Sequence, residues 1–341
     1  MALLPLDIVR TNIASPALYP QRLDLGRQAL LFTRMSENDY RAASFLDDRI
    51  LTPASEGRWV KFNEMAPRIE TLAPTLPLHF IFHAGHVGST LVSRMLDDVG
   101  GVLPLREPHP LRTLAELHDA NSPDAARLAP WLLALWRRGF ADTRAVVLKA
   151  TSSAARIHDA LLGALPQSRA LYLNLGAEPY LAALLAGENT PLDLQGHAPE
   201  RQRRLAALGV DLLTEPATSL GEAAAMAWAA EKLTQKRAEA AFPDRVLSID
   251  FDRFLADPGA ALGQICAHFR LQAPEDYISG AARHGALTRY SKAPEHAFTP
   301  TIRAQILADS RARNAAEIAK GLRWLETHAR SAPALAAALS A

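Results

Sequence analysis

The chain has 341 residues, of which 49% are hydrophobic and 21% are charged, a composition typical of a soluble globular protein. Its formal net charge of +1 excludes a bulk electrostatic attraction to nucleic acid. Cys266 is the single cysteine, so no intramolecular disulfide forms, and we interpret this residue as a small buried hydrophobe. No apolar stretch reaches the ~20 residues that span a bilayer. These features predict a cytoplasmic protein without membrane or nucleic-acid partners.

The first 75 residues read as an N-terminal extension with one strand at 29–33 and one helix from Ser36 to about Asp47. From Leu78 onward, short apolar segments alternate with helical patterns, as in βαβ units. The predicted strands are 79–83, 102–105, 145–149, 170–174 and 246–250. This order predicts one α/β domain over 76–341, with a doubly wound parallel sheet of about five strands flanked by helices.

Several helices have recognisable first residues. Ser122-Pro123 places a capping residue before a proline, and the Ser219–Glu222 spacing is a capping box before an Ala-rich helix. Thr299-Pro300 opens a helix whose apolar spacing continues to about Thr327. Between about 187 and 216 the sequence is rich in Pro, Gly and Arg, which we interpret as an inserted excursion of the kind that often covers an active site.

The segment LHFIFHAGHVGSTLVSRMLDDVGGVLPLRE, which begins at Leu78, carries the clearest chemical signal. An apolar strand leads into a small-residue loop with Gly85 and Gly88, and a helix opens at Ser89-Thr90. Unpaired N–H groups of such a loop and of the first helical turn bind anions, usually phosphate. An ordinary strand-to-helix turn is the alternative. The ATP-type loop G-x-x-x-x-G-K-[ST] fits poorly, because His83 and Ser89 fall at its first Gly and its Lys.

The run Gly88-Ser89-Thr90-Leu91 resembles the phosphosulfate-binding loop of the sulfotransferase family, and suggests a divergent bacterial branch of it. The resemblance implies a P-loop fold, the donor PAPS and no metal. It implies that Gly85 and the segment Val87, Gly88, Ser89 and Thr90 hold the donor 5′-phosphate. His86 stands where the family has Lys or Arg, so a group that titrates near neutrality would face the bridging oxygen.

The same resemblance suggests further catalytic residues. Glu107 occupies a place similar to the catalytic Glu of the tyrosylprotein branch, and we interpret it as the general base. A helix cap, a salt bridge to Arg106, and His109 as base are the alternatives. Lys149 closes a strand, where ligands bind in open sheets, and is expected to reach the donor. A solvated surface lysine is the alternative.

One part of the family pattern is missing. Family members hold the ribose 3′-phosphate with an Arg and a Ser, but these positions read Ala177 and Leu185 here. Losing the Arg alone predicts about tenfold to a hundredfold weaker donor binding. Arg289 and Lys292 are candidate replacements, with an exposed charged loop as the alternative. The segment 245–258 also resembles the family, and we interpret it as scaffold.

The sequence therefore predicts a transferase that moves a sulfuryl group from PAPS to a hydroxyl or amine acceptor, on a small molecule or a peptide. Two other hypotheses stay open. A P-loop phosphotransferase using ATP would explain the missing 3′-phosphate contacts, but not the missing loop Lys. A non-catalytic binding module on the same fold would explain both departures.

Overall fold

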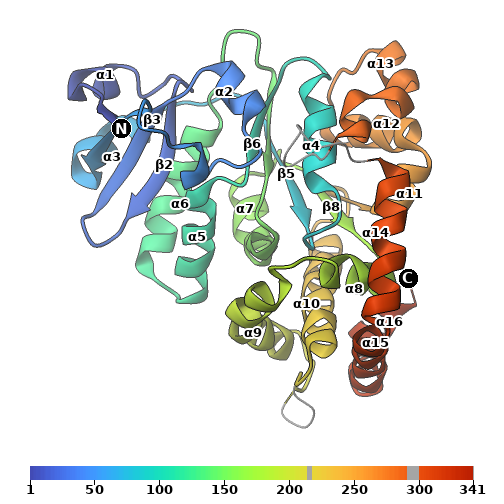
Figure 1. Cartoon of the computed structure of the whole chain (residues 1–341). Helices are drawn as coiled ribbons and strands as arrows, with labels where there is room; N and C mark the ends of the chain where they lie inside the picture. Colours follow the sequence, from blue (N-terminus) through green and yellow to red (C-terminus); the bar gives the residue numbers. More distant parts are fainter. Residues whose placement is uncertain (213–216, 290–298, 341) are drawn as a thin grey trace. The chain divides into compact units, whose positions relative to one another are not determined.

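The chain carries two sheets (Figure 1) in a computed structural model that describes residues 1–212, 217–289 and 299–340. The strands of the first sheet are β1 Ala2–Leu3, β2 Leu18–Asp24, β3 Ala29–Arg34 and β4 Glu56–Lys61. The strands of the second sheet are β5 Leu78–His83, β6 Val102–Arg106, β7 Ala145–Lys149, β8 Ala170–Asn174 and β9 Val246–Asp250. All five predicted strands of the second sheet are thus confirmed, three of them with the predicted bounds.

The second sheet has the strand order β6-β7-β5-β8-β9. Both β5 and β6 pair with β7 in parallel, and Lys149 of β7 lies opposite both Ile81 and Arg106. After β5, the chain forms β6 and β7 toward one edge of the sheet and then β8 and β9 toward the other edge. The strand β5 is therefore the topological switch point, where ligands bind in such sheets. The α/β doubly wound fold class is therefore confirmed.

Helices connect these strands in the order that the sequence predicts. The α-helices are α1 Leu6–Thr11, α2 Glu37–Ala42, α3 Phe62–Glu70, α4 Ser89–Asp97, α5 His109–Asp119, α6 Pro123–Trp136, α7 His158–Ala164, α8 Ala177–Leu185, α9 Thr190–Ala207, α10 Leu220–Ala241, α11 Phe251–Ala256, α12 Pro258–Phe269, α13 Glu275–Gly280, α14 Pro300–Arg313, α15 Ala315–Ala329 and α16 Pro333–Leu339. Short 3₁₀ turns cover Asp48–Ile50, Ser152–Ile157, Ala281–Arg283 and Gly285–Thr288. The caps at Ser122 and Ser219 form as predicted.

The N-terminal region contains more structure than its sequence pattern indicates. Its sheet has the order β1-β4-β3-β2, with β3 antiparallel to both of its neighbours. The predicted strand at 29–33 is β3, whereas β2 and β4 were not predicted. Pro20 lies inside β2 at a register shift, and Gly57 lies inside β4; both residue types argue against a strand in a sequence pattern.

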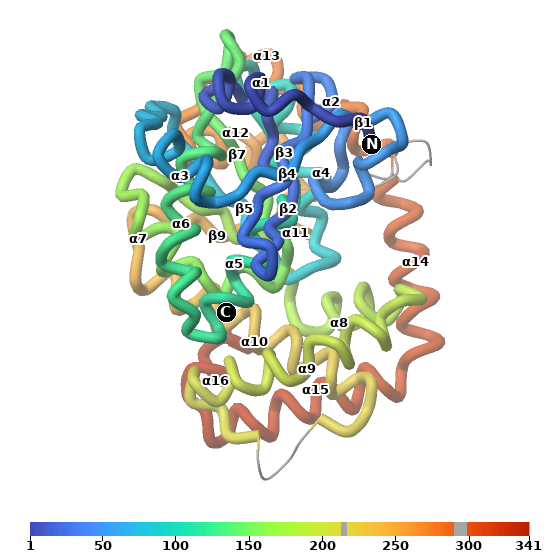
Figure 2. Tube along the Cα trace, turned by 90° about the vertical axis from the view of Figure 1, so that its left-hand side faces the viewer, coloured from blue at the N-terminus to red at the C-terminus, as the bar shows by residue number. Residues whose placement is uncertain are grey.

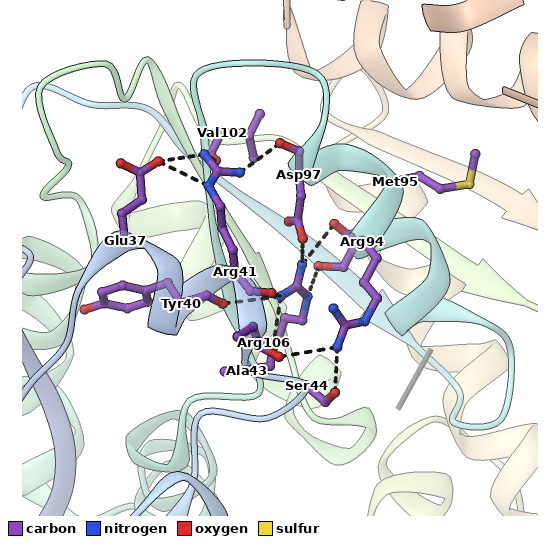
Figure 3. Close-up of polar contacts among 12 residues, drawn as sticks. Glu37, Tyr40, Arg41, Ala43, Ser44, Arg94, Met95, Asp97, Val102 and Arg106 are labelled. Atoms are coloured by element: carbon purple, nitrogen blue, oxygen red, sulfur yellow. Dashed lines mark hydrogen bonds and ion pairs between the residues drawn. The ribbon is translucent and has the colours of Figure 1, made fainter. Parts of the chain in front are cut away.

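Helix α2 ends at Ala42, several residues before the predicted end near Asp47. Figure 3 shows the reason: Arg106, whose side chain is fully buried, donates hydrogen bonds to the carbonyls of Tyr40, Arg41 and Ala43. These carbonyls belong to the last turn and its exit, where a helix leaves acceptors unpaired. A guanidinium on β6 therefore completes the end of α2.

The helix α10 is the centre of a helical layer in which α8, α9 and α15 lie beside it, as Figures 1 and 2 both show. The α10–α15 approach is close because a Cβ on Gly221 would lie 1.8 Å from the Glu317 carbonyl oxygen. The predicted excursion 187–216 forms α9 over most of its length. The predicted single helix from Thr299 to Thr327 is wrong, because Asn314 leaves helical geometry and separates α14 from α15.

The contacts between residues divide the chain into two compact units. The first contains Met1–Phe82, Thr90–Ala170 and Cys266–Ile278. The second contains His83–Ser89, Leu171–Ile265 and Ser279–Ala341. Cys266 is buried, as predicted, and burial raises the pKa of its thiol to about 11. This thiol is therefore protonated near neutral pH and fills space in the core.

His79 on β5 makes the stability of the first unit depend on pH. Its ring stacks on Phe269 with centroids 5.0 Å apart, and its Nδ1 accepts a hydrogen bond from the Arg169 amide. Burial, with positive charge from His268, Arg169 and Arg270, lowers the pKa of His79 to about 4. In the unfolded chain the pKa is about 6.5, so only the unfolded state takes up this proton as pH falls between these values.

We therefore expect the His79 contribution to be complete above pH ~6.5 and to be lost as pH falls toward ~4, by about 3 kcal/mol in total. Urea unfolding at several pH values checks this for the wild type and for His79→Phe, which keeps the stack on Phe269. The unfolding free energy of the wild type minus that of His79→Phe should decrease as pH falls. A difference that stays constant over this range would contradict a neutral, buried His79.

Candidate active site

The predicted anion loop connects β5 to α4 in a conformation that its residues favour. Gly85 and Gly88 have φ angles of 85° and 69°, in the left-handed region that suits glycine. His86 has a φ angle of 54°, which a non-glycine residue adopts at a cost of about 1–3 kcal/mol. Since such backbone strain concentrates at functional sites, the loop that the sequence singled out is also conformationally unusual.

Several donors of this segment have no acceptor among the residues that the structure describes. The Val87 and Gly88 amides make no hydrogen bond there, and the buried Thr90 hydroxyl has no partner either. The Gly85 amide, in contrast, donates to His83 Nδ1 over 3.1 Å. Burial of an unpaired hydroxyl is costly, so an acceptor from outside the chain would be favourable here. The candidate anion site thus centres on Val87–Thr90.

The second unit holds the loop from several directions. Tyr180 on α8 donates its hydroxyl hydrogen bond to the Ala84 carbonyl over 2.9 Å. A Cβ placed on Gly187, in the α8–α9 connection, would lie 3.7 Å from His86 Cε1. The exposed His86 is therefore next to the start of the predicted excursion, and that part of the chain can influence which molecule reaches the imidazole.

An aromatic ring from α11 covers one side of the loop. A Cβ on Gly88 would fall 1.9 Å from Phe251 Cζ, so only glycine fits beneath this ring. The Arg303 guanidinium lies 5.2 Å from the centroid of Phe251 and pairs with Asp252 over 2.8 Å. The sequence pattern of 245–258 indicated scaffold and did not predict this contact. No local pattern signals it, because Phe251 and Gly88 are far apart in the chain.

In the first unit, Glu107 and Lys149 form a pair at the ends of neighbouring strands. Their side chains make an ion pair, with exposed fractions of 16% for Glu107 and 0% for Lys149. The Glu107 amide also donates to the Lys149 carbonyl over 2.7 Å. Glu107 has a φ angle of 52°, a second strained residue among the predicted catalytic ones. The alternative partner for Glu107, Arg106, binds Asp97 instead.

This pair defines what each residue can do chemically. Lys149 is fully buried and holds the Glu107 carboxylate through the ion pair, so this carboxylate has a fixed position. The Phe45 ring lies beneath Lys149, with its centroid 6.0 Å from Nζ. His109, the alternative base, has a buried Nδ1 without a partner among the described residues, and burial lowers its pKa. A lowered pKa keeps its imidazole neutral at pH 7.

The remaining predicted positions are spread over the second unit. Arg289 is exposed, and Lys292 lies outside the described residues. Ala177 and Leu185 are the first and last residues of α8, and Leu185 is buried. Between them, Glu178 is bound by Arg311 through two hydrogen bonds of 2.8 Å. The expected 3′-phosphate positions therefore present no cation of their own.

The described residues offer neither a metal site nor a membrane-spanning helix. No group of three or more His, Cys, Asp or Glu residues within 1–212, 217–289 and 299–340 is arranged to hold a metal ion. Over the same ranges, every helix is too short or too polar to cross a membrane.

Comparison with known proteins gives distant structural likenesses. The sulfotransferase domain of the curacin biosynthetic pathway is 14% identical, with a TM-score of 0.40 over 71% of this chain and 99% of that domain. A mouse sulfotransferase complexed with PAP is 10% identical, with a TM-score of 0.43 over 82% of this chain and 95% of that one. A Mycobacterium avium sulfotransferase is 13% identical, with a TM-score of 0.41 over 74% of this chain and 80% of that one. No protein-family model and no curated protein sequence matches the chain.

Proposed function

We propose that the protein is a sulfotransferase that moves a sulfuryl group from PAPS to a hydroxyl or amine acceptor, on a small molecule or a peptide. The observation that carries this proposal is the set of donors at the start of α4: the Val87 and Gly88 amides and the buried Thr90 hydroxyl, which have no partner among the described residues. These groups suit a phosphate oxygen. The loop lacks the Lys of ATP-type loops, which favours PAPS over ATP.

Each residue has a role in this reaction. The Val87–Thr90 donors hold the 5′-phosphate of the donor. Glu107 accepts the proton of the acceptor hydroxyl or amine as that atom forms its bond to sulfur. The bond between sulfur and the bridging phosphate oxygen breaks, and His86 stabilises the negative charge that develops on that oxygen. Lys149 positions Glu107 through their ion pair.

Ligand-dependent thermal stabilisation tests this proposal. A ligand at 100 times its Kd should stabilise the fold by ~2.7 kcal/mol. We expect PAP and PAPS to raise the melting temperature and Mg-ATP to leave it unchanged. Stabilisation by Mg-ATP alone would favour the phosphotransferase hypothesis. No response to any of the three would favour a binding module that does not use this donor.

His86→Ala should abolish turnover while leaving the fold intact, because the side chain is exposed and contributes to the transition state. Sulfuryl transfer with labelled PAPS would measure the rate, and circular dichroism would verify folding. Exposed His118 on α5 offers the matched substitution, His118→Ala, which should keep the wild-type rate. Wild-type turnover in His86→Ala would remove His86 from the mechanism.

A further inference from the structure

The missing 3′-phosphate contacts raise the question of which cation replaces them. In the proposed function the donor carries a dianionic group at the ribose 3′ position, and the β8–α8 junction is where the expected Arg position, Ala177, lies. Glu178 at this junction is already bound by Arg311. Any replacement must therefore come from another element that reaches the carboxyl end of β8.

One face of α10 reaches that end. Trp228 donates from Nε1 to the Leu175 carbonyl over 2.9 Å, and Gln235 Oε1 accepts a hydrogen bond from Asn174 Nδ2 over 2.8 Å. Asn174 is the last residue of β8 and Leu175 is the next. Since residues spaced by three and four positions share one face of a helix, Lys232 lies on the same stripe between these two contacts. Lys232 is thus placed at the β8–α8 junction.

Lys232 is also a cation without an ion-pair partner among the described residues. It is half-buried, and none of the described residues makes a hydrogen bond or an ion pair with its ammonium group. Burial, together with the like charge of Lys236, lowers its pKa, while Glu239 and Asp250 act in the opposite direction. Both carboxylates already have other partners. Glu239 binds Lys236 and Ser248, and Asp250 caps α11 through the Asp252 and Arg253 amides.

A half-buried ammonium has lost part of its hydration and receives no ion pair in return. An anion with several oxygens at the β8–α8 junction would supply the missing hydrogen bonds. We propose that Lys232 binds the 3′-phosphate of the nucleotide donor, in place of the Arg that the family has at position Ala177. This inference rests on the proposed function, since it assumes a donor of this type.

Calorimetric titration with two nucleotides separates this inference from the proposed function. PAP carries both phosphates, whereas adenosine 5′-phosphate lacks the 3′-phosphate. Lys232→Gln should weaken PAP binding about tenfold to a hundredfold, the range for one charge-assisted hydrogen bond. It should leave the affinity for adenosine 5′-phosphate unchanged. Lys232→Arg, which keeps the charge, should recover most of the PAP affinity.

Lys236→Gln is the matched control, because Lys236 is one turn further along α10 and already pairs with Glu239. It should bind both nucleotides like the wild type. If Lys232→Gln binds PAP like the wild type, or loses affinity for both nucleotides equally, the assignment of Lys232 is wrong while the proposed function stands. If the wild type binds neither nucleotide, the proposed function fails and this inference fails with it.

Discussion

Glu107→Gln should lower turnover by about 10²–10⁴-fold, the range for a positioned general base, and change PAP affinity by much less. The amide keeps the size of the carboxylate but cannot take the acceptor proton. Its partner Lys149, whose side chain is fully buried, would lose its counter-charge, so some loss of stability is expected as well. Single-turnover rates at saturating PAPS measure the chemical step apart from donor binding.

Glu116→Gln on α5 is the control, because Glu116 is exposed and has no place in the proposed chemistry. It should keep the wild-type rate. An unchanged rate in Glu107→Gln would mean that the base lies elsewhere, with His109 as the next candidate.

Arg106→Met should destabilise the first unit by about 3–5 kcal/mol, the usual cost of removing one member of a buried ion pair. The Arg106 side chain is fully buried. It pairs with Asp97 and donates hydrogen bonds to Ser93 and to the end of α2. Burial raises the pKa of Asp97 to about 6, although the neighbouring Arg106 acts to lower it. Without Arg106, this carboxylate either stays charged without a partner or takes up a proton.

The double variant Arg106→Met with Asp97→Leu should recover part of the lost stability, because removing both charges is far less costly than removing one. The carbonyls at the end of α2 would still lack their donor, so recovery should be incomplete. Urea unfolding of both variants, with exposed Arg112→Met as control, measures these differences. A single variant within about 1 kcal/mol of the wild type, or a double variant no better than the single one, would contradict this account.

Most of the second sheet was predictable because β5, β6, β7 and β8 are buried along their whole length. Segments such as Ala145–Lys149 and Ala170–Asn174 are therefore continuous apolar runs, and their bounds were exact. The loop at Gly85–Gly88 was predictable for a related reason, since positive φ angles require the glycines that the sequence shows. In both cases the physical cause acts on neighbouring residues and leaves a local signal.

The contacts that complete the site leave no such signal. Phe251 on Gly88, Lys149 on Glu107 and Arg106 on the end of α2 each join residues that are far apart in the chain. The predicted end of α2 was wrong for the same reason, because the helix ends where Arg106 binds its carbonyls. Lys232 was missed because a lysine in an Ala-rich helix looks like an ordinary solvated residue until its neighbours are known.

A crystal structure with PAP tests the central claim most directly, because the claim concerns which atoms of the loop contact phosphate. We predict that the 5′-phosphate oxygens lie within hydrogen-bond distance of the Val87 and Gly88 amides and of the Thr90 hydroxyl. His86 should face the side of this phosphate from which sulfate has left. A nucleotide bound elsewhere, with the Thr90 hydroxyl still unpaired, would contradict the assignment of this loop as the donor site.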